Sequence, residues 1–188
     1  PIWRWRTLPE SGGIGLFRYR MESAAKIPNP WTETVLRLYS PKEPLADGSH
    51  TLYVQERDEA GNWSAAGQAT VEIDGTAPNA PIVTGTASPA NDTTPQWTWS
   101  TGGGDGAGAY RYDLDSSGVW TETTATAFTP ASALGEGTHR LTVQERDTAG
   151  NWSVDSFFDI FIDLTPPGAP VVTGPASPTN DVTPEWTW

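Results

Sequence analysis

The sequence lacks cysteine, long apolar runs and an excess of positive charge. Without cysteine, neither a disulfide framework nor a thiolate metal site can form. No apolar run approaches the roughly 18 residues that a membrane-spanning helix needs. The 11 Lys and Arg residues stand against 23 Asp and Glu residues, so the net charge is −12. Because few basic residues are present to neutralise phosphates, we expect no nucleic-acid binding. Because no apolar run is long enough, we expect no membrane insertion.

Catalytic motifs are also missing. The sequence has no HExxH, GxSxG or P-loop pattern, and its two histidines, His50 and His139, occupy equivalent positions at the start of a strand. The glycine-rich run 102–106 lacks the lysine of a phosphate loop and precedes a strand, which favours a flexible loop. The carboxylates of Asp113 and Asp115 are better explained by a local polar hairpin than by a glycosidase pair. We therefore predict that the chain is not an enzyme.

Proline, glycine and tryptophan are abundant instead. The chain contains 17 Pro, 19 Gly and 10 Trp. Proline and glycine at this density exclude long helices, whereas threonine, valine and the aromatic residues favour strands.

An internal repeat organises the chain. The segments Val54–Ser64 and Val143–Ser153 are nearly identical and lie 89 residues apart. Other segments recur in the same order: Trp3-Arg4-Trp5 as Trp97-Thr98-Trp99 and Trp186-Thr187-Trp188, Trp31 as Trp120, and Ala80–Gly85 as Ala169–Gly174.

The best-defined copy of the repeat predicts seven short strands. They are expected at residues 81–85, 96–100, 110–114, 120–124, 127–129, 138–146 and 152–163. Short strands separated by turn signals every 8 to 12 residues are typical of an immunoglobulin-like β-sandwich. The predicted fold class is therefore all-β, with tandem immunoglobulin-like repeats.

Three domains follow from the repeat. Residues 1–75 form a repeat without its own first strand, residues 76–164 a complete repeat, and residues 165–188 the first two strands of a truncated repeat. An isolated pair of strands cannot bury its tryptophans. We expect that the sequence is a window from a longer array; the alternative is that strands are exchanged with a neighbouring chain.

The repeat carries one recurrent set of oxygen-bearing side chains. Asp58 with Asn62 and Asp147 with Asn151 bracket a turn, while Asp74 and Asp163 end the last strand just before a proline-containing linker. In a head-to-tail array, Asp74 is expected to lie near Asp147 and Asn151. Carboxylate, amide and turn carbonyl oxygens suit Ca²⁺, so these six residues are candidate calcium ligands. The alternative is an Asx turn, with the terminal Asp capping the linker.

The tryptophans permit a second kind of site. Most recur at strand positions and are expected to pack the core, as Trp97 and Trp99 do on one strand face. Trp31 and Trp120 are expected to be the most exposed, and they are the candidates for contact with a glycan or another surface ligand.

The DxAGNxS turn, a following strand that ends in Asp, a linker with Thr and Pro, and an APxVTG strand together resemble the bacterial immunoglobulin-like repeats of large secreted adhesins. The resemblance covers the whole chain. It implies an extracellular location at the bacterial cell surface and a role as spacer and assembly unit, with calcium at the junctions. The expected partners are neighbouring repeats, and other copies if the protein forms a fibre. A carbohydrate- or surface-binding module is the alternative.

Overall fold

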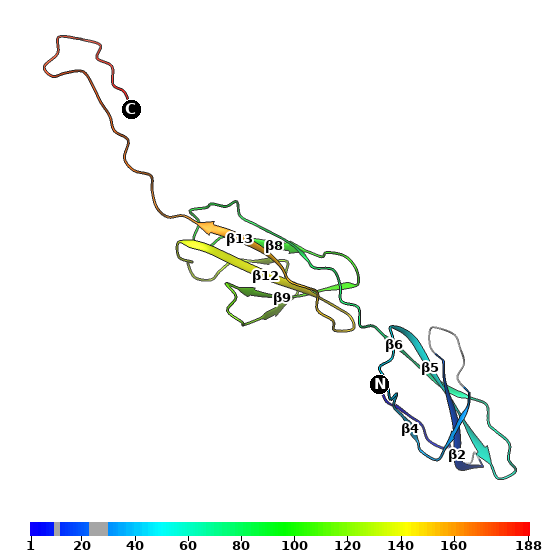
Figure 1. Cartoon of the computed structure of the whole chain (residues 1–188). Coiled ribbons are helices and arrows are strands. Elements are labelled where there is room, and N and C mark those ends of the chain that lie inside the picture. The colour runs from blue at the N-terminus through cyan, green and yellow to red at the C-terminus, as the bar shows by residue number, and fades with distance from the viewer. Residues whose placement is uncertain (10–11, 23–29) are drawn as a thin grey trace.

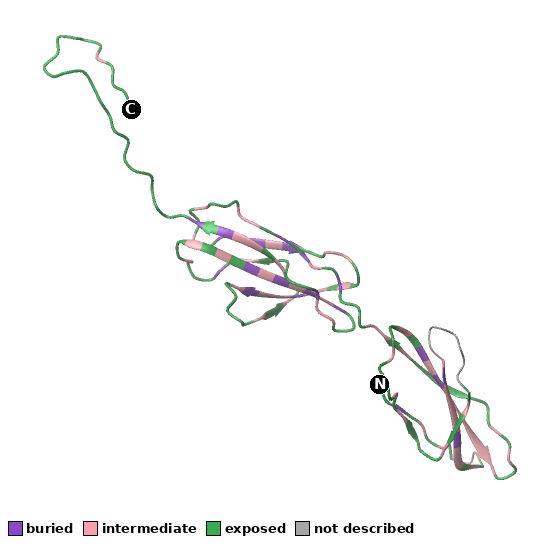
Figure 2. Ribbon diagram, in the orientation of Figure 1, coloured by how far each residue is buried: buried purple, intermediate pink, exposed green. Residues whose placement is uncertain are grey.

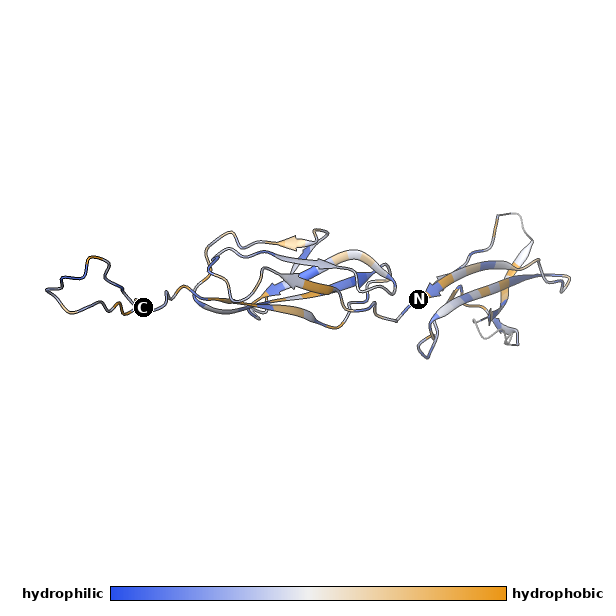
Figure 3. Ribbon diagram, turned by 90° about the horizontal axis from the view of Figure 1, so that it is seen from above, coloured by the Kyte–Doolittle hydropathy of each residue, from blue (hydrophilic) through white to orange (hydrophobic). Residues whose placement is uncertain are grey.

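The structure is a computed structural model that describes residues 1–9, 12–22 and 30–188. Its described residues contain β-strands and no helix, so the all-β prediction is confirmed, and no helix among them is long and apolar enough to cross a membrane. The strands form two groups that follow one another along an extended molecule (Figures 1 and 3). We call β1–β6 the N-terminal unit, β7–β13 the central unit, and residues 165–188 the C-terminal segment.

The central unit is a sandwich of two antiparallel sheets. Its strands are β7 (Ile82–Gly85), β8 (Trp97–Ser100), β9 (Gly106–Leu114), β10 (Thr121–Thr123), β11 (Ala127–Phe128), β12 (Gly137–Asp147) and β13 (Ser156–Ile162). One sheet has the order β11-β8-β7, and the other has the order β10-β9-β12-β13. The strands correspond to the seven that the sequence predicts.

The core of the central unit lies between these sheets. Alternate residues of a strand face the same side, so Trp97 and Trp99 of β8 both point inward, as do Leu141 and Val143 of β12. Val83 of β7, Tyr110 of β9 and two isoleucines of β13 complete the buried cluster. The Trp97 indole also donates a hydrogen bond from Nε1 to the Phe158 carbonyl (3.0 Å), which ties the two sheets together.

The N-terminal unit has the same larger sheet and a smaller second one. Its strands are β1 (Trp3–Arg4), β2 (Gly13–Glu22), β3 (Thr32–Thr34), β4 (Leu38–Tyr39), β5 (Gly48–Asp58) and β6 (Gly67–Ile73). The order β3-β2-β5-β6 repeats that of β10-β9-β12-β13, whereas β1 pairs only with β4 in the described residues. Among its described residues the buried cluster comprises Trp3, Met21 and Leu52, and Figure 2 shows less burial here than in the central unit.

Two strand boundaries differ from the prediction. β9 begins at Gly106, inside the expected loop, because Gly106 pairs with Asp147 of β12. The carboxylate of Glu145 lies next to Gly106. A Cβ at Gly106 would lie 2.4 Å from the Glu145 side chain, so any other residue at this strand position would require Glu145 to move. β13 begins at Ser156 and not at Trp152, since the Ser153 hydroxyl accepts the Glu145 N–H (3.0 Å) and interrupts the pairing.

Candidate functional site at the junction of the two units

The linker after β6 is held by the unit that precedes it. The Asp47 carboxylate accepts hydrogen bonds from the Gly75 N–H (2.8 Å) and from the Thr76 hydroxyl (2.7 Å). These bonds, led by that from Thr76, lower the pKa of Asp47. The Asp74 carboxylate accepts the Thr76 N–H (3.0 Å), which is an Asx turn. The first residues of the linker therefore have a fixed conformation.

The same linker is held by the unit that follows it. The Asn151 side chain, in the turn between β12 and β13, donates from Nδ2 to the Asp74 carbonyl at 3.0 Å and approaches the Thr76 carbonyl at 3.5 Å. The same amide donates to Asp147 Oδ2 (2.8 Å), while Asp147 Oδ1 accepts the N–H groups of Gly150 and Asn151. Asn151 is thus fixed by its own turn before it contacts the linker.

Burial alone would raise the pKa of Asp147. The hydrogen bonds from the Asn151 side chain and from the N–H groups of the turn outweigh this effect, so the pKa of Asp147 lies below its ordinary value. The carboxylate is therefore ionised at neutral pH, as a strong acceptor for Asn151 requires.

The junction brings Asp74 and Asn151 together through the Asp74 main chain. The Asp74 carboxylate is turned to its own linker, and Asn151 presents a nitrogen, not an oxygen, to the two linker carbonyls. Within the described ranges no group of three or more acidic or histidine side chains has the arrangement of a metal site. Ca²⁺ takes six or more oxygen ligands. The Asp74 carboxylate and the Asn151 amide, in the orientations described, do not supply such a set. The calcium assignment stays a prediction that chelation can test.

The other candidate ligands make matching local bonds. Asp58 accepts the Asn62 N–H (2.7 Å) and the Asn62 side-chain amide (3.1 Å), as Asp147 does with Asn151. Asp163 accepts the Thr165 N–H (3.0 Å), as Asp74 does in the first linker. The structure therefore places each candidate Asp in a local turn.

Two acidic residues of the site were missed from the sequence. Asp47 holds the first linker, and Glu136 accepts the Thr165 hydroxyl (3.0 Å) at the equivalent position of the second. Each stands just before the glycine that opens a long strand, Gly48 or Gly137. An acid 29 residues before a linker threonine in both copies was the available signal.

Trp120 lies against an arginine. The Arg111 guanidinium stands 4.6 Å from the Trp120 ring and 4.4 Å from the Trp152 ring, so it is enclosed between two indoles. It also donates from Nε to Gln144 (2.6 Å). Such a stack stabilises both the cation and the rings.

Trp31 has the same environment in the N-terminal unit. Arg18 stands 4.8 Å from the Trp31 ring and 4.4 Å from the Trp63 ring. Both candidate tryptophans are half-buried with an arginine over the ring, and Trp31 has a second one, Arg20, at 5.0 Å. Trp186 and Trp188 are 58% and 89% exposed, so the prediction that Trp31 and Trp120 are the most exposed is wrong. Glycan binding at Trp31 and Trp120 stays a prediction.

The carboxylates of Asp113 and Asp115 belong to separate local structures. Buried Asp113 accepts the Ser117 N–H (3.0 Å) and hydroxyl in the turn after β9. Asp115 contacts His139 Nδ1 at 2.7 Å, and the Gly135 carbonyl lies 3.0 Å from His139 Nε2. Burial alone would lower the pKa of His139, but Asp115 and the carbonyl raise it.

Comparison with known proteins identifies the fold of the central unit. Residues 81–164 match the family model of the bacterial Ig-like domain, which confirms the resemblance for that part of the chain. A search of curated proteins gave no match. Similar solved structures include the fibronectin(III)-like modules of CbhA from Clostridium thermocellum, at 15% identity and a TM-score of 0.39, covering 83% of this chain and 82% of that one. A two-domain fibronectin type-III segment of chicken tenascin has 12% identity and a TM-score of 0.37, covering 85% of this chain and 90% of that one.

Proposed function

We propose that the chain is a tandem-repeat spacer in an extracellular bacterial surface protein or fibre. The premise is the match of residues 81–164 to the bacterial Ig-like domain family. Its role is mechanical and not catalytic: each repeat adds a fixed length and presents its end to the next repeat. The partners are neighbouring repeats of the same protein. The extended shape of the molecule supports this role (Figure 3).

The observation that carries the proposal is the linker held from both sides. Asp47 fixes Gly75 and Thr76 from the N-terminal unit, and Asn151 contacts the Asp74 carbonyl from the central unit. A linker without such contacts behaves as a flexible coil and adds no defined length. A linker fixed at both ends transmits direction from one unit to the next, as a spacer requires.

The second linker supports repetition of the same device. Glu136 and Asp163 hold Thr165 as Asp47 and Asp74 hold Thr76. The strand that follows the first linker lies on β8, and the C-terminal segment contains a copy of that strand sequence. The recurrence of these bonds at both linkers supports one junction device used repeatedly along an array.

Small-angle X-ray scattering of the chain at low concentration tests the proposal. A β-strand rises about 3.3 Å per residue, so each unit, with its 11-residue central strand, contributes about 36 Å of length. We expect a scattering profile of an extended particle with a narrow range of angles between the units. A profile that requires compact forms, or a wide ensemble of bent forms, would show that the linker does not set direction.

A further inference from the structure

The two histidines of the chain make the same contact in both units. His50 Nε2 lies 2.7 Å from the Ala46 carbonyl oxygen, and His139 Nε2 lies 3.0 Å from the Gly135 carbonyl oxygen. In each unit this carbonyl belongs to the turn that leads into the long strand, β5 or β12. A carbonyl oxygen only accepts, so the contact is a hydrogen bond when Nε2 carries a proton and donates it.

The residue after each of these carbonyls is the acid that holds a linker. Asp47 accepts the Thr76 hydroxyl at 2.7 Å. Glu136 accepts the Thr165 hydroxyl at 3.0 Å. In the part of the chain that the structure describes, the histidine ring provides the only hydrogen bond to the main chain of the turn residues 46–47 and 135–136. The ring therefore fixes the turn that orients the acid toward the linker.

The two rings differ at their second nitrogen. His139 Nδ1 lies 2.7 Å from Asp115 Oδ2. His50 Nδ1 is buried and has no hydrogen-bond partner among the described residues. Glu22 stands at the position of Asp115 in the N-terminal unit and pairs with Arg20 instead (3.4 Å). One ring proton is therefore sufficient for the contacts of His50, whereas the contacts of His139 require two.

His139 can donate to both of its acceptors only as the imidazolium. An ionised carboxylate and a carbonyl accept and do not donate, so each ring nitrogen must bring its own proton. A neutral ring has one N–H, and the charged Asp115 is the stronger acceptor for it. The lone pair of Nε2 then faces the Gly135 carbonyl oxygen at 3.0 Å. The hydrogen bond that fixes the turn is thereby lost.

One carboxylate faces the His139 ring. Asp115 follows β9, while the residue opposite His139 on β13 is apolar. The charged neighbours on β12 have other partners, since Glu136 is bonded to the linker and Arg140 to Asp159 (2.7 Å). Burial lowers the pKa of His139, but the bonds to Asp115 and to the carbonyl outweigh burial, so the pKa lies above its ordinary value of 6.5. The ring therefore loses its proton above about pH 6.5.

We propose that His50 and His139 are positioning residues for the two linkers, and that the linker after the central unit loses its fixed conformation when His139 loses its proton. The linker between the two units keeps its conformation as the pH rises, because the Nε2–H of His50 is sufficient to hold its turn. The inference rests on the proposed function, since only a fixed linker can be freed.

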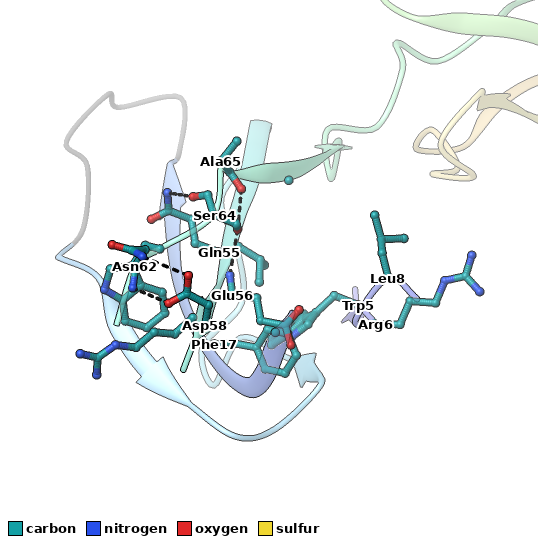
Figure 4. Close-up of a pocket in the computed structure, with 15 residues that line it drawn as sticks. Trp5, Arg6, Leu8, Phe17, Gln55, Glu56, Asp58, Asn62, Ser64 and Ala65 are labelled. Carbon is teal, nitrogen blue, oxygen red and sulfur yellow. Dashed lines mark hydrogen bonds between the residues drawn. The ribbon is translucent and has the colours of Figure 1, made fainter. Parts of the chain in front are cut away.

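The histidine and the asparagine turn lie at opposite ends of one strand. β12 contains His139 near its start and ends at Asp147, which holds Asn151. β5 likewise ends at Asp58, which holds Asn62 (Figure 4). An 11-residue strand is about 36 Å long. A change at His139 therefore leaves the bond between Asn151 and the first linker in place, and the two linkers can be tested separately in one molecule.

Nuclear magnetic resonance relaxation of the Cα–H bonds in the full 188-residue chain tests the inference, because these bonds do not exchange with water as the pH changes. A rigid main chain has an order parameter of about 0.85, and a flexible one has a value below about 0.6. Between about pH 5 and about pH 9, we expect Thr165 to change from the rigid to the flexible value. Thr76 should stay rigid as the pH rises.

Two variants separate positioning from titration. His139→Gln supplies an amide that can donate to the Gly135 carbonyl and does not titrate, so Thr165 should stay rigid at both pH values. Asp115→Asn supplies an amide that can donate to Nδ1, which leaves the N–H of the neutral ring for the carbonyl and should also remove the pH dependence. Melting curves at both pH values check that each variant is folded.

His50 is tested in the same way at the first linker. His50→Ala should make Thr76 flexible at both pH values, and His50→Gln should keep it rigid. If Thr165 stays rigid at both pH values in the unmodified chain, or becomes flexible equally in His139→Gln, the inference is wrong and the spacer role stands. If Thr76 and Thr165 are both flexible at every pH, the linkers are not fixed and the proposed function fails as well.

Discussion

The bond between Asn151 and the linker can be removed without touching the fold of either unit. Asn151→Ala deletes the donor to the Asp74 carbonyl and also the bond to Asp147. Asn62→Ala is the matched control: it deletes the equivalent bond to Asp58, and no linker carbonyl is bonded to Asn62 in the described residues. The difference between the two variants isolates the contact across the junction.

The magnitude follows from one neutral hydrogen bond. Such a bond contributes about 0.5–1.5 kcal/mol net, so its loss shifts the ratio of fixed to free junctions about fivefold at 1 kcal/mol. Each variant also loses one bond to the aspartate of its own turn, so the free energy of unfolding should fall in both. The variants should therefore differ in junction order and not in stability.

Pulsed electron paramagnetic resonance between two spin labels measures this difference. The chain has no cysteine, so Thr32→Cys and Thr121→Cys, at equivalent exposed strand positions, place one label on each unit. We expect a narrow distance distribution for the labelled chain and for Asn62→Ala, and a broader one for Asn151→Ala. If both variants broaden the distribution equally, or neither does, the Asn151 contact does not orient the units.

Four further predictions concern charge and aromatic stacking. Arg111→Leu removes a guanidinium from between two indoles and should lower the free energy of unfolding by about 1–2 kcal/mol in chemical denaturation, with Arg111→Lys intermediate. The raised pKa of His139 means that its stabilising contribution is present below about pH 6.5 and is lost as the pH rises through the folded pKa; Asp115→Asn should flatten this dependence in melting experiments. If Ca²⁺ binds at the junction, EDTA should lower the melting temperature and Ca²⁺ should restore it, whereas an unchanged melting curve would end the calcium assignment. On a glycan array, Trp31→Ala and Trp120→Ala should abolish any signal that the unmodified chain gives, and a signal that survives both changes would place the ligand elsewhere.

Much of the fold was predictable because the signals were local. Alternation in Trp97-Thr98-Trp99 and in Leu141-Thr142-Val143 gave the inward faces, since successive side chains of a strand point to opposite sides. Turn residues separated the strands. The start of β9 was not predictable in the same way, because Gly106 is in a strand through its pairing with Asp147, a residue distant in sequence.

The site was predictable in position but not in chemistry. The order of the units implied that Asp74 would meet the Asn151 turn, and the structure brings them together. The sequence does not say which atoms meet, because an aspartate can bond through its carboxylate or its carbonyl. Here the Asp74 carboxylate is used by Thr76, two residues away, which leaves the carbonyl for Asn151. Local turn bonds decided the outcome.

The two copies of the turn explain how one motif can both stabilise a repeat and join it to another. A side-chain amide has two N–H groups. In each copy the amide donates to the aspartate of the turn, Asp58 or Asp147, which fixes the side chain within its own unit. Asn151 also donates to the linker, and Asn62 has no second acceptor in the described residues. Since the turn orders the donor before any junction forms, joining a further repeat costs little additional side-chain entropy. A small contact is then sufficient to orient a short linker, and the same turn can serve at every junction of an array.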